Sequence, residues 1–521
     1  MAGIRLSGLA SGIDTETMIK QLMQAERTPV DRLSQKKQTL TWQRDAYREM
    51  NRGLLELRTA ASDMLLSKNY VAKAATSSDS SKIAVTANVS SVVGSITIEK
   101  IGQLASAASV TVQGTLGQSS DTTLADSELF QVDGSGKVNV QINSFAANGA
   151  AISETISLDS TQKLSDLISA INGKSSLGMS AVYNEITGKL VLTKTSTGKL
   201  NPDGADITIR DANADTELVN SQSPTLGKDG KNAEYTIGGQ VLEQRTNTFT
   251  QNGLTITLNG TSDTATTLNT KLDTQANFDS IKKFVDKYND LIDKMNKKVR
   301  EEKYRDFQPL TDAQRKDLSE DEVKKWEEKA MSGVLKNDSF LRDGMTSFRS
   351  AISGKIDTGY SYTADSKTIE LNYMSQIGIT TTSDFRDGGK LKLDETKLKK
   401  MLEEQPEGVY KLFTADAPEP AKDAQGNPIP STAGLDGFVR QIQGFATTMR
   451  DKISKVAGLD GAVATTYRLG KSLADLDKSM LTWEDKLTKK ENAYYRRFAA
   501  MEQAMNQANS QSATLASYLG Q

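Results

Sequence analysis

The sequence predicts an α+β multidomain fold, with long terminal coiled-coil helices, a mixed helical and sheet domain, and β-rich antiparallel domains inserted between them. Glycine and proline, which break helices, are absent from Lys471 to Leu519 and reduced to Gly53 between Val30 and Met64. In both segments apolar residues recur at seven-residue steps. The middle, from Ile83 to Leu258, is rich in Gly, Ser, Thr and Asn and alternates apolar with polar residues, as antiparallel strands do.

The N-terminal segment carries start signals for two helices. Asp14 is the expected N-cap of a short first helix, and Thr28 is the expected N-cap of a second, with Pro29 at its first position. Beyond Pro29, one seven-residue row consists of Leu33, Leu40, Tyr47, Leu54 and Ala61. A companion row three residues further on consists of Lys36, Gln43, Met50, Leu57 and Met64. The stripe formed by the two rows is therefore polar at first and apolar later.

The C-terminal segment holds the longest heptad row. Its members are Leu473, Met480, Leu487, Tyr494, Met501, Ala508 and Leu515, and apolar companions continue on one side or the other, among them Leu476, Trp483, Phe498 and Met505. Sustained heptads with charged neighbours favour a coiled coil. The two terminal helices could pack as an antiparallel hairpin within one domain. The polar last turns, from Asn506 to Ser517, favour a stripe that is completed by partner chains, because such a helix is marginal alone.

The central part of the chain reads as short strands, followed by helices. Strands are expected at 83–87, 96–98, 138–142, 190–192 and 254–258, with one helix from Leu164 to Ile171. A wide apolar stripe from Phe278 to Met295 predicts a core helix. The charged stretch after it contains two capping boxes, at 311–314 and 319–322. Four of nine prolines fall between Pro418 and Pro430, which predicts a surface loop or linker.

Composition restricts the possible chemistry. The 521 residues include no Cys and no His, which removes disulfides, thiolate sites and the commonest general base and metal ligand. The net charge of −2 gives no reason to expect nucleic acid as a partner. The N-terminus lacks the pattern of a secretory signal peptide, and no apolar run is long enough for membrane insertion.

Motifs that suggest catalysis or cofactor binding are incomplete. Gly-Lys-Ser occurs at 173–175 and 470–472, but a phosphate-binding loop needs a glycine five residues earlier, where Ile168 and Thr465 stand. The turn at 133–136 lacks the acidic ligands of a calcium loop. Paired carboxylates such as those at 320–322 lie among lysines on expected exposed helices. We therefore expect no catalytic, metal or cofactor site and no enzyme activity.

Four separated blocks resemble one family. The opening Gly8, Leu9, Ala10, Ser11, Gly12, Ile13 and Asp14, followed by 18–23, is similar to the N-terminus of flagellar hook-associated protein 2, the filament cap. The segments 326–338 and 377–395 resemble its central part, and 495–512 resembles its C-terminal helix. The segment from Leu164 to Thr195 is similar to a small module of flagellins and their relatives.

The resemblance implies a body plan of legs, core and head. Its expected divisions are N-terminal leg helices (1–45), a helix of the leg and core domain (46–80), an inner β-rich head domain (81–112 and 233–276), an outer head domain with the flagellin-like module (113–232), a helical and sheet core domain (277–470) and a C-terminal coiled-coil leg helix (471–521). The assembly seam is then expected at Leu33, Leu40, Tyr47, Leu54, Leu57, Leu473, Met480, Leu487, Tyr494, Phe498 and Met501.

The resemblance also implies location and partners. The protein would be exported through the flagellar type III apparatus without a cleaved signal peptide and would form an annular homo-oligomer, a pentamer or hexamer, at the filament tip. Expected partners are flagellin, the hook–filament junction protein and an export chaperone, with host mucin or glycans as candidate ligands of the head. The alternatives are another filament-associated protein (a flagellin or a hook–filament junction protein), a β-rich surface adhesin and a carboxylate-based hydrolase.

Overall fold

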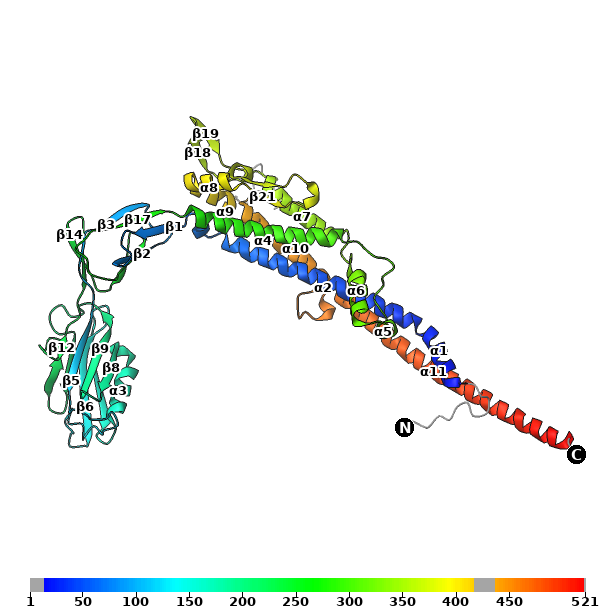
Figure 1. The fold of residues 1–521 in the computed structure, drawn as a ribbon, viewed down its shortest axis with the longest axis horizontal. Coiled ribbons are helices and arrows are strands. Elements are labelled where there is room, and N and C mark those ends of the chain that lie inside the picture. The colour runs from blue at the N-terminus through cyan, green and yellow to red at the C-terminus, as the bar shows by residue number, and fades with distance from the viewer. Residues whose placement is uncertain (1–13, 417–435, 520–521) are drawn as a thin grey trace, which may run out of the picture. The chain divides into compact units, whose positions relative to one another are not determined.

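The computed structural model describes residues 14–416 and 436–519 (Figure 1). They form two compact units: a helical unit of residues 14–70, 274–416 and 436–519, and a β unit of residues 71–273. Helices dominate the first unit and antiparallel sheets the second, so the predicted α+β multidomain fold is confirmed. The proline-rich segment between Pro418 and Pro430 lies outside the described residues.

The helical unit contains ten helices and two short hairpins among its described residues. The helices are α1 (Thr15–Glu26), α2 (Thr28–Asp63), α4 (Thr274–Arg300), α5 (Asp312–Asp317), α6 (Glu320–Met331), α7 (Ser339–Ser353), α8 (Glu395–Glu404), α9 (Pro406–Thr414), α10 (Phe438–Ala457) and α11 (Arg468–Leu519). The hairpins are β18 (Ser361–Ala364) with β19 (Lys367–Glu370), and β20 (Ile379–Thr381) with β21 (Leu391–Leu393).

The start of the first helix matches the prediction and the start of the second does not. Asp14 caps α1, and its Oδ1 accepts a hydrogen bond from the Thr17 amide at 2.9 Å. Thr28 is the first residue of α2, so the N-cap position falls on Arg27, which has a helical backbone (φ −75°, ψ −17°) and makes no side-chain cap hydrogen bond. The Thr28 hydroxyl instead donates to the Ala25 carbonyl at 2.8 Å, so α1 continues into α2 with almost no interruption.

Both predicted capping boxes are present in the α5–α6 hairpin. The Thr311 amide donates to Gln314 Oε1 at 3.0 Å, and the Gln314 amide donates to Thr311 Oγ1 at 3.3 Å. The Ser319 amide donates to Glu322 Oε2 at 2.9 Å, and the Glu322 amide returns a bond to Ser319 Oγ at 3.4 Å. Each pair satisfies backbone donors that the first helical turn leaves open.

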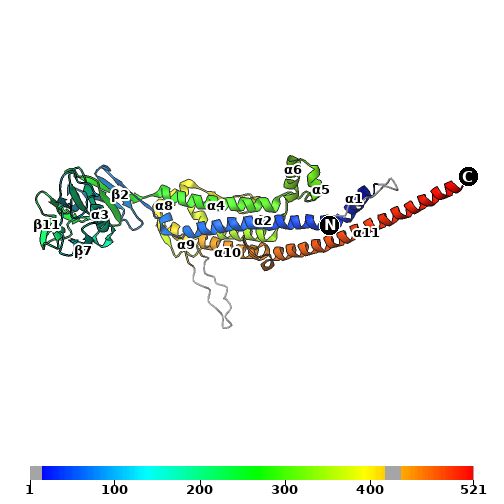
Figure 2. The ribbon, with the colours of Figure 1, turned by 90° about the horizontal axis from the view of Figure 1, so that it is seen from below.

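The core of the helical unit lies between α2, α4, α7 and α10, and α2, α4 and α10 run side by side (Figure 2). Aromatic rings meet edge to face in it: Tyr288 with Phe348 at 6.0 Å and Phe284 with Phe438 at 6.1 Å between centroids. Gly344 allows α7 to approach α10, since a Cβ there would stand 2.4 Å from the sulfur of Met449. The predicted core helix from Phe278 to Met295 is confirmed as part of α4.

The β unit consists of short antiparallel strands in five sheets. The sheets, in spatial order, are β1 (Lys73–Ser77), β17 (Thr266–Leu272), β3 (Gly94–Ile98); β14 (Gln240–Gln244), β13 (Ala233–Ile237), β4 (Lys100–Gln103); β15 (Thr248–Gln251), β16 (Leu254–Leu258), β2 (Ile83–Ala87); β11 (Thr216–Asn220), β10 (Ile207–Asp211), β6 (Lys137–Phe145), β7 (Ala151–Asp159); and β12 (Gly227–Lys228), β5 (Ala107–Gln113), β9 (Lys189–Thr197), β8 (Met179–Asn184). The five predicted strands all fall within these elements.

The β unit has two hydrophobic clusters. One belongs to the two four-stranded sheets and α3 (Leu164–Gly173), the predicted interrupting helix, whose Leu164, Leu167 and Ile171 are buried in it. The other belongs to the three three-stranded sheets and includes Tyr235 stacked on Phe249 at 4.9 Å. Because β4 and β13 pair with each other, the chain between them forms an insertion that begins and ends at adjacent strands.

Candidate assembly seam

The predicted seam residues lie on two helices of the helical unit. Leu33, Leu40, Tyr47, Leu54 and Leu57 lie on α2, and Leu473, Met480, Leu487, Tyr494, Phe498 and Met501 lie on α11. Their burial changes along both helices. On α2, Leu33 and Leu40 are half-buried, whereas Tyr47, Leu54 and Leu57 are at most 2% exposed. The apolar half of the predicted seam is therefore already covered within one chain.

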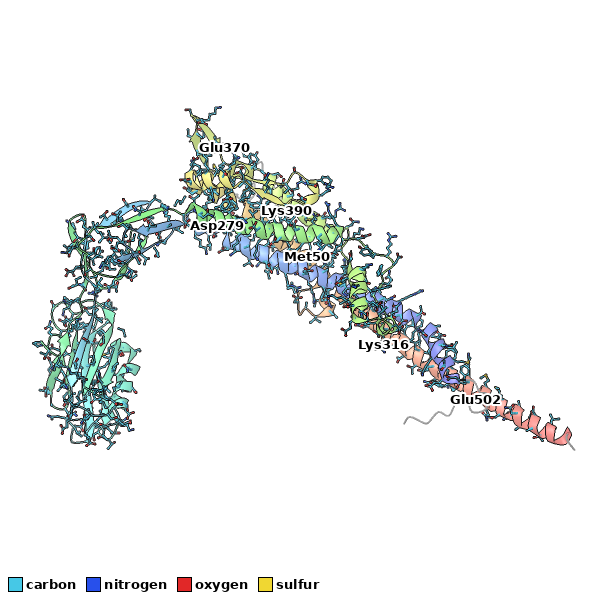
Figure 3. All side chains as sticks on the ribbon, in the orientation of Figure 1. Met50, Asp279, Lys316, Glu370, Lys390 and Glu502 are labelled. Atoms are coloured by element: carbon cyan, nitrogen blue, oxygen red, sulfur yellow. The ribbon has the colours of Figure 1, made fainter. Side chains whose placement is uncertain are left out.

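Two helices, α4 and α10, cover the C-terminal half of α2. Helix α4 packs against α2 at Gly53, where a Cβ would stand 2.9 Å from Leu291 Cδ1. Met50, labelled in Figure 3, lies in this half of α2. From α10, the Ser454 hydroxyl accepts a hydrogen bond from the Asn51 side-chain amide at 3.2 Å. The buried half of the predicted seam is therefore an intramolecular core.

Tyr47 links α2 to the start of α7. Its hydroxyl donates a hydrogen bond to Asp338 Oδ2, and Asp338 Oδ1 accepts one from the Leu341 amide at 3.0 Å, which makes Asp338 the N-cap of α7. Burial, together with the bond to the Asp338 carboxylate, raises the pKa of Tyr47 far above its ordinary value. The hydroxyl therefore remains a donor at every physiological pH.

Polar pairs fix the register of α11 against α1 and α2. The Lys37 ammonium lies 2.5 Å from Asp477, and Glu26 accepts from both the Lys490 ammonium and, at 3.1 Å, the Tyr494 hydroxyl. Lys37 lies eleven residues after Glu26, whereas its partner Asp477 lies thirteen residues before Lys490, the partner of Glu26. The helices are therefore antiparallel. This is the hairpin arrangement that the heptads left open as an alternative.

Contact with Lys490 and Tyr494 also acts on the charge of Glu26. The hydrogen bond from Lys490 has the largest effect and lowers the pKa of the Glu26 carboxyl. The bond from Tyr494 lowers this pKa further, while desolvation opposes both. The paired state is thus favoured wherever this carboxyl is ionised.

The turn between α10 and α11 is held by a residue that the heptad pattern does not reveal. Arg48 of α2 donates from Nε to the Ala457 carbonyl at 3.1 Å, and its guanidinium lies 5.5 Å from the centroid of the Tyr467 ring. Asp460 accepts from Arg52 at 3.0 Å. The sequence does not reveal these arginines, because charged positions on a helix do not show which loop they contact.

The sequence analysis also did not identify α10 as the helix that covers α2. A detectable signal was present, because apolar residues recur at three- and four-residue spacing in it: Phe438, Val439, Ile442, Ala446, Met449, Ile453 and Val456. All seven are at most 6% exposed. The pattern identifies an amphipathic helix, but it does not identify the helix that α10 packs against.

The distal part of α11 has no such cover. Leu473 and Leu487 are buried, Met480, Tyr494 and Phe498 are half-buried, and Met501 and Leu515 are 36% and 60% exposed. Extending the antiparallel register places the first residues of α1 opposite about residue 502 of α11, and Figure 1 shows α11 continuing beyond α1. Glu502 marks this point in Figure 3. Among the described residues, nothing covers the heptad row past Phe498 as α2 covers its beginning.

Most of the N-terminal motif lies outside the described residues: this holds for Gly8, Leu9, Ser11, Gly12 and Ile13, and only Asp14 is described. Hydrogen bonds from the hydroxyl and amide of Thr17 lower the pKa of the Asp14 carboxyl, which keeps the cap ionised. In residues 14–416 and 436–519 no three acidic side chains gather as a metal site would require. No helix in that part of the chain is both long and apolar enough to cross a membrane.

Family models match most of the sequence. The model of the N-terminus of flagellar hook-associated protein 2 matches residues 11–108, and that of its C-terminus matches residues 230–510. A third model, the flagellin hook IN motif, matches residues 144–196, which contain the module predicted from Leu164 to Thr195. These matches confirm the resemblance found at the two ends and in the centre of the chain.

Two relatives match over nearly their whole length. The flagellar hook-associated protein 2 of Halalkalibacterium halodurans is 34% identical over 98% of this chain and 99% of its own. That of Thermotoga maritima is 23% identical over 98% of this chain and 95% of its own. The crystal structure of the D1-D2-D3 domains of the flagellar cap protein FliD from Escherichia coli superposes with a TM-score of 0.54 at 22% identity, covering 83% of this chain and 99% of that chain. This last likeness shows a shared fold.

Proposed function

Because this chain belongs to the flagellar hook-associated protein 2 family, we propose that several copies cap the distal end of the flagellar filament as a ring. There they promote the folding and insertion of flagellin, and with it filament elongation and motility. The terminal helices supply the legs that touch the filament end. The ring is a pentamer or a hexamer.

One observation supports this proposal more than any other: the heptad row of α11 continues beyond the helices that cover its first half. Leu473 and Leu487 are buried against the chain's own helices, whereas Met501 and Leu515 continue the same row in solvent. A narrow apolar stripe on a long helix gains stability when a second helix packs on it. We propose that flagellin or a neighbouring subunit packs on residues 498–515.

The structure changes which variants test the seam. Aspartate at Leu473 or Leu487 would bury a charge and unfold the helical unit, so lost motility would be uninformative. Met501→Asp with Leu515→Asp changes only exposed positions. In cells that lack their own cap protein, this variant should be secreted as a folded protein and fail to restore filaments. Normal filament length would contradict a role for this stripe.

A matched control lies on the opposite side of the same helix. Gln503 and Ser510 are exposed and off the heptad row, so Gln503→Asp with Ser510→Asp adds the same charge to the same helix. This variant should restore filament growth. If both variants fail equally, added charge on α11, and not loss of the stripe, is the cause.

We further propose the partners and segments that the family plan implies. The segments 1–45 and 471–521 serve as legs, 46–80 as a helix of the leg and core domain, 277–470 as core, and 81–112 with 113–232 and 233–276 as head. Export proceeds through the flagellar type III channel with a dedicated chaperone, and the chain adjoins the hook–filament junction protein before filament growth. The head is the candidate surface for host mucin or glycans.

We propose that the chain performs this role without catalysis. No histidine or cysteine is available, and the family is a structural one. Incubation of the purified protein with peptidoglycan and with polysaccharides should release no products. Any cleavage that survives repurification would contradict this proposal.

A further inference from the structure

Three arginines surround one hollow of the helical unit. The hollow has a volume of about 490 Å³ and lies between the C-terminal end of α4, one face of α7 and the loop before β21. Arg300, Arg342 and Arg349 line it, together with Met345 and with Phe385, whose side chain is 73% exposed. It combines positive charge with apolar surface, as protein interfaces that bind acidic segments do.

The described residues neutralise the positive charge of this hollow only in part. In residues 14–416 and 436–519, no carboxylate lies within ion-pair distance of Arg300, Arg342 or Arg349. The nearby Asp384 carboxylate binds Arg386 at 2.9 Å, and this contact, with a weaker contribution from Arg300, lowers its pKa. Arg342 and Arg349 stand seven residues apart on one face of α7, about 10 Å along the helix at 1.5 Å per residue. The hollow therefore presents two guanidinium groups in a row and a third opposite them.

A surface of opposite charge lies at the start of α6. Its first turn carries Glu320, Asp321 and Glu322, all exposed. Glu322 is committed to the capping box with Ser319. Glu320 and Asp321 form no ion pair with any described residue. The half-buried Val323 follows them, so an apolar side chain accompanies the acidic pair.

We propose that the arginine hollow of one copy receives the acidic first turn of α6 from a second copy, an inference that rests on the proposed ring. Glu320 and Asp321 face Arg342 and Arg349, and Phe385 covers Val323. The two surfaces belong to different parts of the chain, which is what a closed ring requires. An interface between two unlike patches repeats head to tail until the rotation closes. Desolvated arginine–carboxylate pairs also fix the register of such a contact.

The absence of native cysteine permits a direct test by cross-linking. Thr346→Cys places one thiol at the hollow, and Lys324→Cys places another one turn after Glu320. Under mild oxidation, an equal mixture of the two variants should yield a disulfide-linked dimer, and neither variant alone should do so. Adding Arg342→Glu and Arg349→Glu to the first variant should abolish the dimer. Absence of the mixed dimer, or its persistence after this charge reversal, overturns the proposal.

Charge reversal tests the same contact by its strength. The hollow variant (Arg342→Glu, Arg349→Glu) and the α6 variant (Glu320→Lys, Asp321→Lys) should each self-associate at least tenfold more weakly than the wild type in sedimentation equilibrium. Mixing them should restore association, since the reversed patches complement each other; misfolded chains would not show this. Lys283→Glu with Lys294→Glu, which makes the same charge change at exposed positions of α4 that do not line the hollow, should leave association unchanged.

These readouts separate this contact from the cap function itself. Wild-type association in both reversed variants overturns the contact, and the cap function then stands if the same variants support filament growth. A wild-type chain that fails to self-associate at any accessible concentration, and fails to restore filaments, contradicts both.

Discussion

The two ends of the α11 heptad row share a sequence pattern and differ in what surrounds them. Near Leu473 the row packs on α2 and belongs to a folded core, and near Leu515 the same spacing stands in solvent. The seven-residue step therefore indicates a helix that packs on a partner, but it does not indicate whether that partner is in the same chain. Under the proposed role, the transition from covered to uncovered separates the part of α11 that packs within its own chain from the part that would pack on a partner.

The largest effect on stability should come from shortening a side chain in the covered region. Leu54 is fully buried between α2 and its neighbours, so Leu54→Ala should lower the free energy of unfolding by about 2–5 kcal/mol. Leu515→Ala should change it by less than about 0.5 kcal/mol, because that side chain is mostly exposed. Urea denaturation of both variants measures the contrast. Equal losses would show that distal α11 is part of the same cooperative core.

A smaller effect should follow from removing one hydroxyl. Tyr47→Phe deletes the hydrogen bond to the Asp338 carboxylate and keeps the ring packed, so it should cost about 1–2 kcal/mol of unfolding free energy. Tyr494→Phe, which deletes a hydroxyl in the half-buried region of α11, is the matched comparison and should shift the urea midpoint less. A larger shift for Tyr494→Phe would reverse the proposed order of stability along the seam.

The smallest effect should be the loss of the Glu26 contacts at low pH. Since pairing with Lys490 and Tyr494 lowers the pKa of Glu26 below that of an ordinary glutamate, this link is present above the ordinary pKa and is lost as pH falls through the lowered one. Hydrogen exchange in α1 should accelerate between about pH 5 and pH 3 relative to that in α4. In Glu26→Gln, α1 exchange should already be fast at pH 6 and show no such step. A step of the same size in the variant would assign the pH dependence to other carboxylates.

Sequence patterns could predict the elements more readily than their partners. The heptads of α2 and α11, the stripe of α4 and both capping boxes depend on local spacing, and the structure has each of them. The N-cap of α2 lies one residue earlier than the sequence predicts, because threonine favours caps in general, while here Thr28 is already the first helical residue. The contacts of Tyr47 with Asp338 and of Arg48 with Ala457 join residues about 290 and 410 positions apart. Local spacing carries no information at that separation.

The uncovered end of α11 also has a consequence for distance. Residues 502–519 rise about 27 Å at 1.5 Å per residue, close to the diameter of a small domain. A helix of that length extends beyond the surface of its own folded unit, while its buried N-terminal part stays packed on the other helices. Under the proposed role, a partner could pack on this end while the buried part of α11 stays in place.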